Sequence, residues 1–155
     1  LVAQSYASFT RTSTNTTGGT AGDDVYVTIA SATMPAGTMG LNSKLTIIPD
    51  WDYANNSSSK FLAVDFGGQS ISVVNLTTGS VEGEILLTVK NLNSLGSQKT
   101  RNGSSYGISN NARLATSVDT SQDVVIDFKA KWSAAQATTQ TVTLLGYSII
   151  HYPGS

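Results

Sequence analysis

The sequence predicts an all-β protein, an antiparallel β-sandwich of jelly-roll type. Apolar and polar residues alternate along several short segments, which is the two-residue period of a strand with one buried face. No window of the chain keeps the three- and four-residue apolar spacing that a helix needs. Turn-forming glycine and asparagine residues separate the segments at intervals typical of sandwiches.

The clearest expected strand is the segment 124–132. One side of it carries Val124, Ile126, Phe128, Ala130 and Trp132, so we expect Trp132 in the core. The other expected strands are marked by Val25, Val27 and Ile29; by Leu45 and Ile47; by Leu62, Val64 and Phe66; by Ile71 and Val73; and by Ile85, Leu87 and Val89.

Two glycine-containing dipeptides predict hairpins. Gly67-Gly68 supplies positive φ angles for a two-residue turn, so residues 60–66 and 69–76 are expected to pair. Asn102-Gly103 is a second hairpin signal, in a polar stretch from residue 91 to 111 that is predicted to be a long loop or an exposed hairpin.

The last expected strand has apolar residues on both sides of its pleat. Val142, Leu144 and Ile150 have one parity, and Leu145, Tyr147 and Ile149 have the other. In an antiparallel sandwich only one face is covered by the partner sheet. A loop of the same chain or a second subunit would have to cover the other face.

Composition restricts the partners and the chemistry. The chain has 155 residues, a net charge of −1 and no run of Lys and Arg, so neither nucleic acid nor membrane insertion is expected. It has 21 serines and 20 threonines against only 12% charged residues, which indicates a surface of neutral hydroxyl groups. Without cysteine and with one histidine, no metal and no cofactor is expected.

Catalytic groups are sparse in this sequence. A Ser-His-Asp triad would depend on His151, which lies near the end of the chain. Glycoside hydrolysis needs two carboxylates across a groove, and Glu82 and Glu84 offer such a pair only by position. We therefore expect a protein that is not an enzyme.

Two patches combine an aromatic ring with short polar side chains, the pattern of a sugar site. The predicted carbohydrate-binding residues are Trp51, Asp52 and Tyr53 in the first patch, and Arg101, Asn102, Tyr106 and Arg113 in the second. Trp51 also shares a pleat face with Leu45, Ile47 and Pro49. It could therefore close the core instead of stacking on a sugar.

The order of several turn-plus-strand motifs resembles the C-terminal domains of bacteriophage tail fibres and tailspikes. These motifs are MPAGTMG at 34–40, KLTI at 44–47, the segment 91–98, VDTS at 118–121 and the ending at 141–150. The resemblance covers most of the chain from Val25 onward. It rests on the order of the motifs and not on any one of them.

This resemblance implies a homotrimeric jelly roll at the distal end of the tail. Residues 1–155 would form one domain, the C-terminal fragment of a longer fibre chain, which begins at Leu1 after an upstream fibre or β-helix domain. The domain would belong to the virion, act outside the cell during attachment, and bind host-surface polysaccharide. A purely structural trimerisation domain and a glycan esterase or hydrolase domain remain the alternatives.

Overall fold

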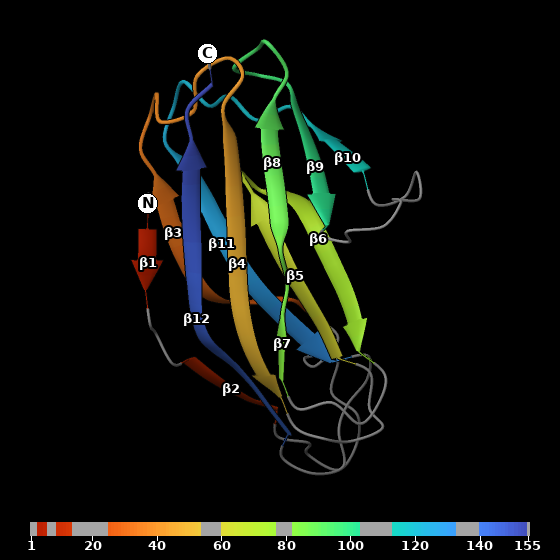
Figure 1. Cartoon of the computed structure of the whole chain (residues 1–155). Coiled ribbons are helices and arrows are strands. Elements are labelled where there is room, and N and C mark those ends of the chain that lie inside the picture. The colour runs from red at the N-terminus through yellow and green to blue at the C-terminus, as the bar shows by residue number, and fades with distance from the viewer. Residues whose placement is uncertain are drawn as a thin grey trace.

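A computed structural model describes residues 3–5, 9–13, 25–53, 60–76, 82–102, 113–132 and 140–154. In these ranges the chain forms twelve strands and no helix, arranged as two antiparallel sheets packed face to face (Figure 1). The predicted all-β antiparallel sandwich is confirmed.

Sheet A is the larger sheet and has eight strands. Its order is β1-β12-β4-β8-β9-β10, with β2 also pairing with β12 and β7 also pairing with β4. Its strands are β1 (Ala3–Ser5), β2 (Phe9–Ser13), β4 (Lys44–Tyr53), β7 (Glu82–Glu84), β8 (Leu87–Asn91), β9 (Gln98–Asn102), β10 (Arg113–Thr116) and β12 (Gln140–Tyr152).

Sheet B has four strands in the order β3-β11-β5-β6. They are β3 (Val27–Met34), β5 (Lys60–Phe66), β6 (Gln69–Leu76) and β11 (Val124–Trp132). The β5–β6 hairpin is the one predicted from Gly67-Gly68, and these glycines have φ angles of 56° and 77°. Positive φ at both turn positions explains why glycine is required there.

The connections follow jelly-roll topology. In sheet A, β12 lies between β1 and β2 on one side and β4 on the other, while in sheet B, β11 lies between β3 and β5. Strands from the two ends of the chain therefore interleave, and successive strands such as β3, β4 and β5 alternate between the sheets. This is the arrangement of two Greek keys in a jelly roll. The hairpin β9–β10 extends sheet A beyond that pattern.

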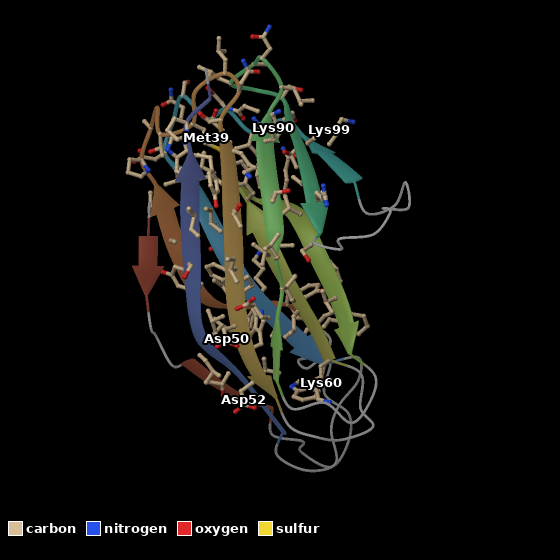
Figure 2. The ribbon with its side chains drawn as sticks, viewed as in Figure 1. Met39, Asp50, Asp52, Lys60, Lys90 and Lys99 are labelled. Carbon is tan, nitrogen blue, oxygen red and sulfur yellow. The ribbon has the colours of Figure 1, made fainter. Side chains whose placement is uncertain are left out.

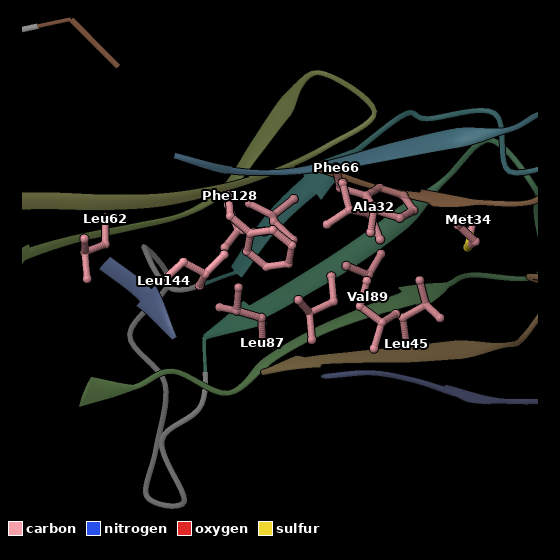
Figure 3. Close-up of a cluster of buried hydrophobic side chains, with 14 of the residues drawn as sticks. Ala32, Met34, Leu45, Leu62, Phe66, Leu87, Val89, Phe128 and Leu144 are labelled. Atoms are coloured by element: carbon pink, nitrogen blue, oxygen red, sulfur yellow. The ribbon is translucent and has the colours of Figure 1, made fainter. Parts of the chain in front are cut away.

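The core lies between the sheets and takes the inward side chains of both (Figure 3). Trp51 and Trp132 are fully buried, as are Leu45, Ile47 and Phe128. Each such side chain contributes roughly 1.5–3 kcal/mol relative to an exposed position. The predicted core face of residues 124–132 is therefore correct.

A β-bulge corrects the interpretation of the last strand. The register between β12 and β4 shifts between Leu144 and Gly146, so Leu145 is an extra residue on β12. A one-residue insertion changes which parity faces inward. Val142, Leu144 and Ile149 are therefore all buried, Tyr147 packs against the same core, and Leu145 faces solvent. Ile150, in phase with outward Tyr152, stays half-buried on the outer side, so the two groups of residues expected from parity alone are wrong.

A second bulge explains another phase error. The register of β5 and β6 shifts between Val64 and Asp65, at the level of Ile71. Ile71 is buried whereas Val73 is exposed, although the alternation placed them on one face. Ser72, between them in sequence, is buried instead.

Candidate functional site

The outer face of sheet A carries three lysines side by side at one end. Lys44 of β4 pairs in register with Lys90 of β8, and Lys90 pairs with Lys99 of β9. Their sequence neighbours Leu45, Val89 and Asn91 are buried. The lysines therefore face outward, and Figure 2 shows Lys90 and Lys99 at the upper end of the sheet.

Arg101 extends this cluster by one register position. It lies two residues beyond Lys99 on β9, on the same outward side, and pairs with Thr88 of β8 and Arg113 of β10. Lys90, Lys99 and Arg101 are exposed and Lys44 is half-buried. We refer to Lys44, Lys90, Lys99 and Arg101 as the basic patch.

The positive charges of the lysines in the basic patch are not neutralised by ion pairs with other described residues. Like charges directly opposite on neighbouring strands are destabilising. Neither Lys90 nor Lys99 forms an ion pair with another described residue, whereas Lys129 and Asp65 on sheet B do form one. An anionic ligand would relieve this repulsion.

An open groove of about 360 Å³ runs through the basic patch. Leu92, which is 41% exposed, adds an apolar surface to its lining. The lining residues are Lys44, Thr88, Lys90, Leu92, Lys99, Thr100 and Arg101.

Tyr152 continues the lysine row onto β12. It pairs in register with Lys44, whose Nζ lies 4.1 Å from the centre of the tyrosine ring. The residue remains 43% exposed. An exposed ring next to hydrogen-bond donors can stack on the apolar face of a sugar. The row across the sheet is thus Tyr152, Lys44, Lys90 and Lys99.

A buried polar network lies directly under the lysines. Gln98 donates from Nε2 to Asn91 Oδ1 (3.0 Å) and to the carbonyl oxygens of Leu95 and Val118. Its Oε1 accepts from Thr116 Oγ1 and from the Val118 backbone N–H, both at 3.0 Å. A fully satisfied buried network restricts the conformation of the strands that carry it. It therefore fixes β8 and β9 in register.

The opposite end of the same face is acidic. Asp50 pairs in register with Glu84 of β7 on one side and Gly146 of β12 on the other, and both carboxylates are exposed. They line a groove of about 240 Å³ with Leu145 at the bulge. Figure 2 shows Asp50 and Asp52 well below Lys90 and Lys99. Among the described residues no group of three or more His, Asp or Glu side chains could hold a metal ion.

Proline shapes this acidic end. Pro49 lacks a backbone N–H and lies inside β4, where a sheet normally excludes proline. The neighbouring pairing is interrupted at this level: Asp50 pairs with Glu84 of β7, and Ile47 pairs with Leu87 of β8. Ile85 N donates to the Pro49 carbonyl oxygen over 3.3 Å in the gap between the two strands.

The first predicted sugar patch is corrected by burial. Trp51 has 0% exposure, so it is a core residue, and the prediction that its ring carries a sugar is wrong. Its inward position follows from the pleat face that it shares with Leu45 and Ile47. Asp52 is exposed at the acidic end, and the Tyr53 side chain lies outside the described part.

The second predicted patch falls at the edge of the basic patch. Arg101 belongs to that patch, and Arg113 is its register partner on β10. Asn102 ends β9, which pairs antiparallel with β10, and Gly103 of the expected Asn102-Gly103 turn lies outside the described residues. Tyr106 and the side chains of Asn102 and Arg113 lie outside the described part.

The structure does not bring the two predicted patches together. Asp52 lies beside β7, whereas Arg101 lies on the far side of β8. The residues that sequence reasoning missed are Lys44, Lys90, Lys99 and Tyr152. They come from four different strands, and only the strand register makes them neighbours.

Comparisons with known proteins identify no family. No family model matches the chain, and no curated protein matches it. A solved structure of the infectious bursal disease virus Gt strain is 12% identical with a TM-score of 0.40, covering 94% of this chain and 30% of that one. The alginate lyase AlgAT5 of polysaccharide lyase family 7 is 11% identical with a TM-score of 0.33, covering 79% and 63%.

The chain thus spans less than two thirds of the length of either structure. Scores this low add nothing to the fold that the strand order already defines. That fold and its surface define an antiparallel jelly-roll sandwich with an open cationic groove on one sheet. Within the described residues there is no helix of the length and apolarity that crossing a membrane requires.

Proposed function

We propose that this chain is a non-enzymatic attachment domain that binds glycans on a host cell surface through the outer face of sheet A. The observation that carries the proposal is Tyr152, an exposed ring on the same row as the lysines of an open groove lined by basic side chains. A ring for the apolar sugar face and nearby donors for its hydroxyl groups are the minimum of a carbohydrate site.

We further propose that the domain belongs to a phage tail, where it is part of the virion and assembles as a homotrimer. This part rests on the order of motifs along the chain. The bulge turns most apolar side chains of β12 inward and leaves on its outward side Leu145, which is 40% exposed, and half-buried Ile150. Three copies would raise weak single-site affinities, in the range of about micromolar to millimolar, to useful avidity.

An enzyme acting on glycans is the second candidate. The observation that favours it is the Asp50–Glu84 register pair in its own groove. Both carboxylates are exposed, however, whereas a general acid is normally held in an apolar, water-poor site. His151 lies on the inward side of β12 in register with buried Leu45, away from any outer-face hydroxyl.

The test of glycan binding uses two substitutions at one position. Tyr152→Phe keeps the ring and Tyr152→Ser removes it, so the first should retain binding to a panel of bacterial surface polysaccharides and the second should lose most of it. Tyr26→Ser, which removes a half-buried ring beside Lys131 of sheet B, is the control for loss of a tyrosine. Equal binding by both Tyr152 variants would contradict the proposal.

Oligomeric state and catalysis are measured on the same protein. Light scattering coupled to size exclusion should give about three times the 16.2 kDa of one chain. A monomeric mass would contradict the proposed homotrimer, and it would leave the proposed glycan site untouched. Release of reducing sugar or acetate from the panel, abolished by Glu84→Gln, would favour the enzyme instead.

A further inference from the structure

We infer that the glycan is an acidic polysaccharide, with negatively charged sugar units, that lies across the strands along the row Tyr152, Lys44, Lys90 and Lys99. This inference rests on the proposed function and names its ligand class. It follows from the spacing of the row, the unpaired charge and the position of the acidic end.

The spacing of the row fits a sugar chain. Neighbouring strands are roughly 4.8 Å apart, which is close to the length of one pyranose unit. Tyr152, Lys44, Lys90 and Lys99 come from four consecutive strands of sheet A. A linear polysaccharide lying perpendicular to the strands would present successive sugars to successive side chains of the row.

The charge of the row selects among sugars. The hydroxyl groups of a neutral sugar would bind Ser, Thr and Asn side chains as well as they bind lysine, and those residues are abundant in this chain. Three lysines directly opposite one another instead carry a repulsion that only a negative partner offsets. Carboxylates on the sugars would form charge-assisted hydrogen bonds, which are stronger than neutral ones.

The acidic end of sheet A favours a polysaccharide that lies across the strands, and it argues against nucleic acid as the ligand. Asp50, Asp52 and Glu84 lie further along the strands on the same face. A polyanion lying along β4 would meet them, whereas one lying across the strands would not. Duplex DNA carries about one charge per 1.7 Å and would bring phosphates over the acidic end as well.

The experiment measures binding of wild-type protein to polygalacturonate, alginate and hyaluronan, with dextran as the neutral polymer and double-stranded DNA as the competing polyanion. We expect binding to at least one acidic polysaccharide, little binding to dextran or DNA, and weakening as salt rises, because salt screens exposed charges. Lys99→Gln should lower affinity by up to about fivefold, the size of one exposed ion pair.

Lysine-to-glutamine variants on the two sheets show where the acidic polymer binds. The double variant Lys90→Gln with Lys99→Gln should lose affinity for the acidic polymer more than either single variant. Lys131→Gln removes one charge from the outer side of sheet B, between the rings of Tyr26 and Phe61, and should bind like wild type. Thermal melts should show no loss of stability for the Lys90 and Lys99 variants, because both side chains are exposed and their removal relieves like-charge repulsion.

The outcomes separate this inference from the proposed function. If dextran or another neutral glycan binds, and Tyr152→Ser abolishes that binding while the lysine variants do not, the function stands and the acidic ligand is wrong. Affinity for acidic polymers that does not change with salt would overturn the inference without any variant. Equal binding of DNA would also overturn it, and no polysaccharide binding at all would remove both proposals.

Discussion

Gln98 donates a hydrogen bond from Nε2 to Asn91 Oδ1 over 3.0 Å, and both side chains are fully buried. These residues are register partners on β9 and β8, and the next pair along the same two strands is Lys99 and Lys90. Because side chains alternate across a strand, the amide pair faces the interior while the lysine pair faces solvent. The inner pair holds the outer pair together against its own repulsion.

Gln98→Ala should therefore be strongly destabilising. The substitution removes the partner of Asn91 Oδ1, of the Val118 N–H and of Thr116 Oγ1. Each buried polar group left unsatisfied costs about 1–3 kcal/mol, so we expect a loss of roughly 3 kcal/mol or more in the free energy of unfolding.

Urea denaturation measures this loss, and Gln122→Ala is the control. The Gln122 side chain bonds only at the exposed surface, to Ser121 Oγ. Its replacement should change stability by less than about 0.5 kcal/mol. Similar effects of the two substitutions would show that the buried network does not hold β8 to β9.

The two glycines of the β5–β6 turn should respond differently to alanine. Both have positive φ, which costs an L-residue about 1–2 kcal/mol. A Cβ on Gly67 would also lie 2.5 Å from Val118 Cγ1, whereas one on Gly68 would have no atom within 4 Å. Gly67→Ala should therefore lower the melting temperature clearly more than Gly68→Ala, and equal shifts would contradict the close packing of the turn on Val118.

Much of this fold could be predicted from the sequence, because alternation reports directly on strands with one wet face. The Gly67-Gly68 hairpin and the core face of residues 124–132 are correct for this reason. What alternation cannot show is a bulge, since one inserted residue reverses the phase and leaves no compositional mark. Leu145 and Ile71 both caused phase errors in this way. Strand β9 was hidden inside a polar stretch because its inward residues, Gln98 and Thr100, are themselves polar.

The bulge at Leu145 predicts very different losses of stability for Leu145 and Tyr147, which are two residues apart. Tyr147 stacks on Phe128 with ring centres 4.5 Å apart, whereas Leu145 faces solvent. Tyr147→Ser should cost about 2–4 kcal/mol of unfolding free energy, and Leu145→Ser less than about 0.5 kcal/mol. Chemical denaturation of both variants checks this, and the reverse order would place the register shift elsewhere.

Because of Lys60, the free energy of unfolding should rise with pH in the alkaline range. Its side chain is fully buried, and burial lowers the pKa of its ammonium group from the ordinary value of 10.5. Between the lowered folded pKa and 10.5 the unfolded chain binds the proton more tightly, so the free energy of unfolding rises with pH across this interval.

Lys60→Met isolates this contribution, since it keeps the length of the side chain and removes the charge. The difference in unfolding free energy between wild type and Lys60→Met, measured in urea at a series of pH values, should move in favour of wild type as pH rises toward 10.5. A difference that stays constant with pH would mean that Lys60 does not carry a lowered pKa.

The candidate site could be predicted only in part. Arg101 was found because it lies next to an asparagine and other polar residues in sequence. Lys44, Lys90 and Lys99 were not found, because they come from three different strands and register alone assembles them. Trp51 shows the converse, since an aromatic residue in a polar sequence setting still lies in the core when its pleat face is apolar.

The most direct test of the account is a nuclear magnetic resonance titration of isotope-labelled protein with an acidic oligosaccharide such as oligogalacturonate. We expect the shifted backbone amides to follow the row of Lys44, Lys90, Lys99 and Tyr152 across sheet A, and those of Asp50 and Asp52 to stay unchanged. Shifts gathered instead at Asp50 and Asp52, or around Lys129 on sheet B, would contradict it.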